Sequence, residues 1–287
     1  MDIHSVLVLL DGGKGSEAAM RTAVRVGLEF TAHGEVLQVE SPSPALLPVM
    51  SGDLPGTASM LDGLQEEADK RRTHAKAVFD VQCREGGLNI VDADAVPNVN
   101  EAAFTWHLIS GHDNPELARR GRLVDLIVIA RADEADGGVD SAVLEAALFD
   151  TGRPVLIAGN GDDDGHVERI AIAWDGSREA AHSLGFSIPF LQTAKEVIVL
   201  SVVDRNPVAD ADRLEQYLMR HGVKSQNVLV YRKGRSVARA LRDEVAARGI
   251  DMVVMGAYGH SAMGEFFFGG VTRDMLKTAH LPLVLAH

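Results

Sequence analysis

The chain has 287 residues, 46% of them hydrophobic and 24% charged, which is enough for two globular domains and argues against a disordered protein. No stretch approaches 18 consecutive apolar residues, which excludes a transmembrane helix of ordinary length. The formal net charge is −13 and the basic residues are scattered, so neither nucleic acid nor a membrane surface is expected as a partner.

Cysteine usage and the first residues bear on the compartment. Cys83 is the only cysteine, so the chain can form neither an internal disulfide nor a cysteine-based metal cluster. Residues 3–10 read as a strand, and neither a positively charged segment nor a cleavage site precedes them. Both features favour a cytoplasmic protein.

The first half opens with an apolar run typical of a strand that is buried on both faces of a parallel sheet. This strand, Val6 to Leu10, ends in Asp11-Gly12, and a helix with Ser16 as its predicted N-cap follows. Next come a proline- and glycine-rich loop at 41–56, a long amphipathic helix at 60–87, and strands at 126–130 and 154–158.

The second half alternates strands and helices throughout, which predicts a parallel sheet with helices on both faces. Ser177, after Asp175-Gly176, is the predicted N-cap of its first helix. The expected strands are 169–174, 196–203, 226–232, 251–256 and 281–286, and the expected helices are 177–192, 210–221, 236–248 and 270–279.

The two halves repeat one pattern in the same order, which predicts two copies of one doubly wound α/β domain. Residues 5–27 match 169–190, so that Asp11 and Gly12 correspond to Asp175 and Gly176. Segment 125–130 matches 251–256, and 152–159 matches 280–287. The polar linker at 160–166 separates the copies, giving domains at 1–160 and 166–287.

The first copy is the longer one. Asp11 and Asp125 are 114 positions apart, whereas Asp175 and Asp251 are 76 apart, so the first copy carries 38 extra residues. They lie mostly between 41 and 100, in the loop and the long helix.

A glycine-rich segment at 255–276, MGAYGHSAMGEFFFGGVTRDML, marks the candidate site. Gly256 and Gly259 follow a strand, and Gly269 and Gly270 open a helix. Glycines let backbone N–H groups approach an anion, and a helix start adds unpaired donors and a favourable dipole. The segment therefore predicts a phosphate site at the carboxyl edge of the sheet.

This spacing, on the fourth strand of a domain whose first strand ends in Asp-Gly-Ser, resembles the universal stress protein family in its tandem form. The resemblance covers Ile3 to Ala286 apart from the insert at 41–100. It implies two doubly wound, parallel, five-stranded sheets of the adenine nucleotide α-hydrolase-like (HUP) type. It also implies that the last strands, Pro154 to Ala158 and Pro282 to Ala286, pair the two halves as an intramolecular pseudo-dimer.

The resemblance further implies that the second domain binds ATP or a related adenine nucleotide. Residues after the first strand and at the end of the second would surround the adenosine, and the glycine-rich segment would hold ribose and phosphates. The family has serine or threonine directly after its last glycine, where this chain has Gly270. The residues carried over are Ala173, Trp174, Asp175, Val202, Met255, Gly256, Gly259, His260, Gly269, Gly270, Val271 and Thr272.

The first copy lacks the glycine loop. Three acidic residues, Asp133, Glu134 and Asp136, stand where a phosphate cradle would be, and their charge would repel a phosphate. We therefore expect no ATP in the first domain, despite Asp11.

Dedicated catalytic and metal motifs are not recognisable. The histidines form no H-x3-H or H-E-x2-H pair, no G-x-S-x-G nucleophile motif occurs, and Mg²⁺ follows only from the polyphosphate. We expect no enzyme beyond weak ATP hydrolysis. The leading hypothesis is a nucleotide-responsive stress or signalling module, and the alternatives are a scaffold without nucleotide and an adenylate-forming or phosphotransfer enzyme. The protein partner, and any further homodimer, stay open.

Overall fold

The computed structural model describes residues 2–40, 57–95, 98–110, 113–131, 140–160, 167–204, 211–257 and 270–287. The predicted loop at 41–56 and all of the predicted linker except Asn160 lie outside these ranges. The first half contains β1 (Ser5–Leu9), α1 (Ser16–Phe30), β2 (His33–Glu40), α2 (Thr57–Gly86), β3 (Asn89–Ile90), β4 (Ala103–Ser110), α3 (Asp113–Gly121), β5 (Leu126–Ile129), α4 (Ser141–Phe149) and β6 (Val155–Ile157).

The second half follows the same alternation of strand and helix. Its elements are β7 (Arg169–Ala173), α5 (Arg178–Thr193), β8 (Glu196–Val203), α6 (Ala211–Arg220), β9 (Ser225–Tyr231), α7 (Val237–Ala247), β10 (Met252–Gly256), α8 (Gly270–Thr278) and β11 (Leu283–Ala286). Each predicted strand and helix of this half is confirmed, with ends that differ by at most two residues.

The strand order is the same in the two halves. The strands form one sheet in the order β3-β4-β2-β1-β5-β6-β11-β10-β7-β8-β9. Within each half all described pairings are parallel, and β4-β2-β1-β5-β6 is the same arrangement as β9-β8-β7-β10-β11. The first half adds the two-residue strand β3 at its outer edge.

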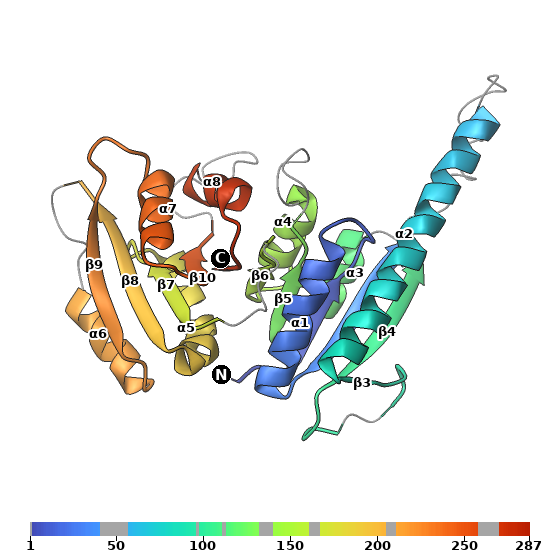
Figure 1. Cartoon of the computed structure of the whole chain (residues 1–287), viewed down its shortest axis with the longest axis horizontal. Helices are drawn as coiled ribbons and strands as arrows, with labels where there is room; N and C mark the ends of the chain where they lie inside the picture. Colours follow the sequence, from blue (N-terminus) through green and yellow to red (C-terminus); the bar gives the residue numbers. More distant parts are fainter. Residues whose placement is uncertain are drawn as a thin grey trace.

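The last strands of the two halves join the sheet across the middle of the molecule (Figure 1). β6 and β11 pair antiparallel, with Ile157 opposite Leu283 and Val155 opposite Leu285. Both strands are fully buried. The expected pairing of the last strands is therefore observed, and it turns two sheets into a continuous one.

Each face of this sheet has its own core. One cluster of buried residues packs under α1, α2, α5 and α6, and the other under α3, α4, α7 and α8. Side chains alternate between the clusters along a strand: Ile172 of β7 faces the first cluster and Ala171 the second. Strands covered on both faces require near-continuous apolar runs, which is the pattern that the sequence shows.

Both copies turn from the first strand into the first helix in the same way. Gly12 and Gly176 adopt positive φ angles of 75° and 78°, a conformation that strongly favours glycine. Ser177 caps α5 as predicted, accepting a hydrogen bond from the Ala180 N–H. The prediction that Ser16 caps α1 is wrong, because Gly15 is the N-cap residue. The Ser16 hydroxyl instead donates a hydrogen bond to the Asp11 carboxylate at 3.2 Å.

The insert of the first half is mainly the long helix α2. It has 30 residues where its counterpart α6 has 10. Only its C-terminal half packs on the sheet, through Ala75, Val78, Phe79 and Cys83, while the rest projects beyond the body of the molecule (Figure 1).

The described part of the chain has neither a membrane-spanning helix nor a cluster of metal-binding side chains. Its helices include none that is both long and apolar enough to cross a membrane. The same residues contain no cluster of three histidine, cysteine or acidic side chains that could hold a metal ion.

Candidate functional site

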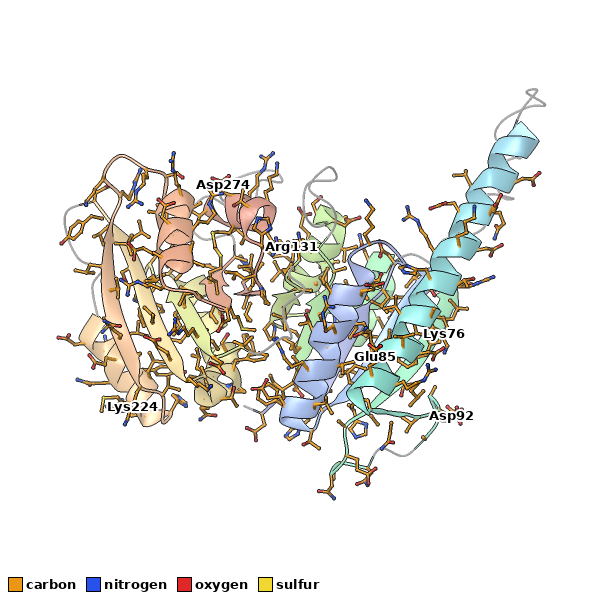
Figure 2. The ribbon with its side chains drawn as sticks, viewed as in Figure 1. Lys76, Glu85, Asp92, Arg131, Lys224 and Asp274 are labelled. Carbon is orange, nitrogen blue, oxygen red and sulfur yellow. The ribbon has the colours of Figure 1, made fainter. Side chains whose placement is uncertain are left out.

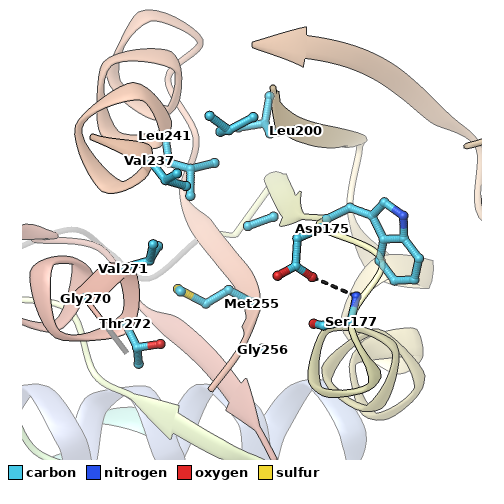
Figure 3. A pocket seen from close by; sticks show the side chains of 13 residues that line it. Asp175, Ser177, Leu200, Val237, Leu241, Met255, Gly256, Gly270, Val271 and Thr272 are labelled. Atoms are coloured by element: carbon cyan, nitrogen blue, oxygen red, sulfur yellow. Dashed lines mark hydrogen bonds between the residues drawn. The ribbon is translucent and has the colours of Figure 1, made fainter. Parts of the chain in front are cut away.

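A cavity of about 290 Å³ lies at the carboxyl ends of β7, β8 and β10, where α5, α7 and α8 begin (Figure 3). This edge of a doubly wound sheet is where ligands enter, because the loops and helix starts that follow the strands converge there. Its lining residues are Ala173, Trp174, Asp175, Ser177, Leu200, Val202, Val237, Leu241, Met255, Gly256, Gly270, Val271 and Thr272.

Most of the predicted site residues therefore come together in one place. Ala173, Trp174, Asp175, Val202, Met255, Gly256, Gly270, Val271 and Thr272 all line the cavity. The other three, Gly259, His260 and Gly269, lie outside the described residues.

Four lining residues were missed from the sequence. Ser177 was predicted only as a helix cap, and Leu200 only as part of a buried strand. Val237 and Leu241 lie on one face of α7, four residues apart, directly after the N-cap Ser236. Two apolar residues at this spacing signal a buried helix face, but the sequence does not tell whether that face meets a core or a cavity.

Apolar side chains line much of the cavity in two groups. One group is Leu200, Val237 and Leu241, and the other is Met255 and Val271 (Figure 3). An apolar wall with a few convergent polar groups is typical of a site for a small organic ligand. This wall suits the flat, weakly polar part of such a ligand.

Asp175 supplies the carboxylate at the rim of the cavity. Its Oδ1 accepts a hydrogen bond from the Ser177 N–H at 2.9 Å, which fixes the side chain in a local turn (Figure 3). No other hydrogen bond to this carboxylate occurs among the described residues. The side chain is exposed, so its second oxygen can accept a hydrogen bond from a ligand hydroxyl.

Trp174 lies between the cavity and the core. It lines the cavity, yet its side chain packs against the core cluster on the opposite face of the sheet, because it alternates with Ala173 along the chain. Its indole nitrogen is buried without a hydrogen-bond partner among the described residues. The partly buried indole ring therefore packs against the core on that face.

Gly256 and Gly270 occupy different surroundings in the same cavity. A Cβ at Gly256 would come within 2.6 Å of the Ala180 nitrogen and 2.8 Å of the Glu179 carbonyl carbon, so α5 can pack against the end of β10 only over a glycine. A Cβ at Gly270 would meet none of the described residues within 4 Å. Gly256 thus has a packing role, whereas no described neighbour requires a glycine at 270.

The first turn of α8 forms the side of the cavity opposite Asp175 (Figure 3). Gly270 is exposed, and Thr272 is 4% exposed. The first N–H groups of a helix have no partner within the helix, and the helix dipole favours negative charge at this end. An anionic group is therefore the ligand that this wall would attract.

The equivalent helix start in the first half is already occupied by a carboxylate. Asp140 caps α4 and accepts hydrogen bonds from the N–H groups of Ala142 and Val143, at 2.9 and 3.1 Å. The N–H donors at the start of α4 are thus satisfied by the chain itself. The predicted acidic residues Asp133, Glu134 and Asp136 lie outside the described residues.

Asp11 differs from Asp175 in its partners as well. Its Oδ1 accepts hydrogen bonds from both the Gly13 N–H, at 2.8 Å, and the Ser16 hydroxyl. The Asp11 carboxylate therefore accepts two hydrogen bonds from its own turn, whereas the Asp175 carboxylate accepts one.

Known proteins resemble the chain in sequence over the second half and in structure over its whole length. The model of the universal stress protein family matches residues 166–287. A universal stress protein from Archaeoglobus fulgidus DSM 4304 superposes with a TM-score of 0.68 at 15% identity, covering 98% of this chain and 97% of that chain.

A functionally unknown protein from Pseudomonas aeruginosa PAO1 superposes with a TM-score of 0.58 at 13% identity, covering 99% of this chain and 92% of that chain. At such identities these neighbours show the fold and nothing more. Curated protein sequences gave no match. Residues 166–287 therefore match the universal stress protein family, and the chain as a whole has the same fold as the universal stress protein from Archaeoglobus fulgidus.

Proposed function

We propose that the second domain binds ATP or a related adenine nucleotide in the cavity between Asp175 and α8, and that the protein acts as a stress-response or signalling module. The observation that carries the proposal is the arrangement of three kinds of group around one cavity. An apolar wall, a carboxylate and the first turn of a helix face the same space.

These groups suit the three parts of a nucleotide. The base would lie against Leu200, Val202 and Leu241, because it is flat and weakly polar. The Asp175 carboxylate would accept a hydrogen bond from a ribose hydroxyl. The phosphates would lie at the first turn of α8, where N–H groups and the helix dipole favour negative charge.

The cavity is large enough to enclose part of a nucleotide. About 290 Å³ is close to the lower end of ligand pockets, roughly 300 Å³. Mg²⁺ would come with the polyphosphate, since no metal-binding side-chain cluster occurs among the described residues.

We expect one nucleotide per chain, bound in the second half only. Asp140 already satisfies the start of α4, and a phosphate there would have to displace a carboxylate of the same charge. In this proposal the first half contributes structure rather than a second binding site.

Titration calorimetry of the intact chain with ATP, ADP and AMP tests the proposal. We expect a stoichiometry of one ATP. Asp175→Asn keeps the oxygen that accepts from Ser177 but removes the charge, so affinity should fall about tenfold, as for the loss of one hydrogen bond to a charged group. The matched variant Asp11→Asn, in the first half, should bind ATP as the unaltered chain does.

The alternatives predict other results. If none of the three nucleotides gave more heat than injection into buffer, the hypothesis of a scaffold without nucleotide would be favoured. Two ATP molecules per chain would show that the first half binds as well. Release of phosphate well above a trace, with or without an added acceptor, would favour an enzyme.

A further inference from the structure

Arg131 follows β5 in the first half, and its guanidinium reaches into the second half. The side chain is 4% exposed and lies where the two halves meet (Figure 2). Nε donates to the Ala158 carbonyl at 3.3 Å, while Nη1 donates to the Leu276 carbonyl and Nη2 to the Leu281 carbonyl at 3.4 Å. Two of its three acceptors thus belong to the second half.

Backbone carbonyls, not carboxylates, compensate the buried charge. No carboxylate of the described residues forms an ion pair with Arg131, and burial lowers the pKa of its guanidinium to about 10. The group stays protonated at neutral pH because this pKa is still well above 7. Removing it would leave carbonyl groups buried without donors, which is costly in a protein interior.

The contact with Leu276 is made at the C-terminal end of α8. The last four carbonyls of a helix lack partners within the helix, and a cation near them is favoured by the helix dipole. Leu276 is within the last turn of α8, which ends at Thr278. Arg131 therefore caps a helix of the other half.

The second half has no such group at the equivalent position. Leu9 pairs with Ile129 in the first half as Ala173 pairs with Met255 in the second, so Arg131 corresponds to Ala257. The arginine stands at the point where the first half departs from the glycine loop. In the first half, the sequence that replaces the glycine loop therefore begins with a contact to the second half.

The helix that Arg131 caps is also the helix whose other end lines the cavity. Gly270, Val271 and Thr272 line it, and Leu276 lies four residues beyond Thr272. At a rise of about 1.5 Å per residue, the capped carbonyl is roughly 6 Å along the helix from the cavity wall. A helix this short moves as one piece, so a contact at one end fixes the position of the other.

We propose that Arg131 is a positioning residue through which the first half holds α8 in place as the anion-binding wall of the cavity in the second half. The part concerning the nucleotide rests on the proposed function. The part concerning α8 does not, and it can be measured without any ligand.

The test compares Arg131→Met, which keeps the length of the side chain but has no donors, with Arg153→Met. Arg153 also donates to a backbone carbonyl, that of Arg122, but both residues are in the first half. In the ligand-free intact chain, amide hydrogen exchange over residues 271–278 should be at least about tenfold faster in Arg131→Met. Titration with ATP should show about a tenfold loss of affinity. Arg153→Met should show neither change.

Each result bears on the proposal. Unchanged exchange in α8 of Arg131→Met overturns it, whether or not the chain binds ATP. Faster exchange with unchanged ATP affinity overturns the link to the cavity. If the unaltered chain binds no adenine nucleotide, the proposed function fails, while exchange still decides whether Arg131 positions α8.

A second variant covers the case in which Arg131→Met does not fold. Arg131→Lys keeps the charge but cannot reach three separate carbonyls, because its donors radiate from one nitrogen. Amide exchange in α8 should then be faster than in Arg153→Met but slower than expected without any donor at position 131. ATP affinity should likewise be weaker than that of Arg153→Met without being lost. Values equal to those of Arg153→Met would contradict the proposal.

Discussion

At the scale of single residues, the two glycines of the cavity wall show how different reasons produce the same residue type. Gly256 is required by the backbone of α5, which passes too close for any Cβ. Gly270 begins α8, and no described residue lies within 4 Å of the position that its Cβ would take. No described neighbour therefore requires a glycine there.

We predict that Gly270→Ser binds ATP about two- to tenfold more tightly, because the added hydroxyl can donate one hydrogen bond to a phosphate, worth roughly 0.5–1.5 kcal/mol. Its stability should not fall, since no described residue lies within 4 Å of the new Cβ. Calorimetry measures the affinity, and denaturant unfolding the stability. Weaker binding by this variant would contradict the assignment of α8 to the phosphates.

Gly256→Ala is the matched change at the other glycine. We predict a loss of about 1–3 kcal/mol in the free energy of unfolding, as for an overpacked core, because the new methyl group would collide with the backbone of Ala180. Urea unfolding of the ligand-free chain measures it. A variant as stable as the unaltered chain would mean that α5 can shift away from β10 at no cost.

At the scale of elements, α2 combines a packed half with a projecting half. Phe79 is fully buried and its ring lies 5.3 Å from that of Trp106, whereas Leu64, four turns earlier, is 47% exposed. Cys83, on the packed half, is fully buried. Burial raises the pKa of its thiol to about 12, the Asp80 carboxylate adds to this, and Lys76 opposes it.

The single cysteine therefore reports on the packing of α2. We predict very slow reaction with a thiol reagent at neutral pH, because almost no thiolate forms and the sulfur is covered. Phe79→Ala should lower the free energy of unfolding by about 3–5 kcal/mol and speed the labelling. Leu64→Ala should leave both within error, and rapid labelling of the unaltered chain would disprove the packing of α2.

At the scale of the whole molecule, the junction of β6 and β11 makes one structure of two similar halves. Leu156 lies opposite Val284 across the junction, and both side chains are fully buried. Strand pairing, core packing and the Arg131 contacts all cross this boundary. The halves should therefore unfold together.

We predict that Leu156→Asp lowers the free energy of unfolding by about 3–5 kcal/mol, because it buries an unpaired carboxylate. Burial raises the pKa of the new aspartate in the folded state. The loss of unfolding free energy is therefore largest at neutral pH, where the carboxylate is charged. It shrinks as the pH falls toward about 3.9, the pKa of an ordinary aspartate. Leu123→Asp, at a position that is 85% exposed, is the control and should have little effect.

The two tryptophans allow each half to be followed separately. Trp106 is in β4 and Trp174 directly follows β7, and the chain contains no others. In Leu156→Asp combined with either Trp106→Phe or Trp174→Phe, the remaining fluorescence should report the same lowered midpoint. A shift confined to one half would show that the junction does not couple them.

The sequence alone determined the succession of strands and helices, the repeat, and the group of residues at the carboxyl edge of the second sheet. This was possible because these properties depend on local patterns. Doubly covered strands need unbroken apolar runs, Ser177 can cap a helix through its own side chain, and Gly176 marks a turn with a positive φ angle.

Only the tertiary structure decided what depends on residues far apart in the chain. The exposed two-residue strand β3 has no apolar pattern, and it exists because β4 lies beside it. The packing role of Gly256 depends on α5, and the role of Arg131 on a helix 145 residues away. Local patterns record the backbone preference and burial of a residue, whereas the partner that a buried charge or a bare backbone meets is fixed only when the two halves pack together.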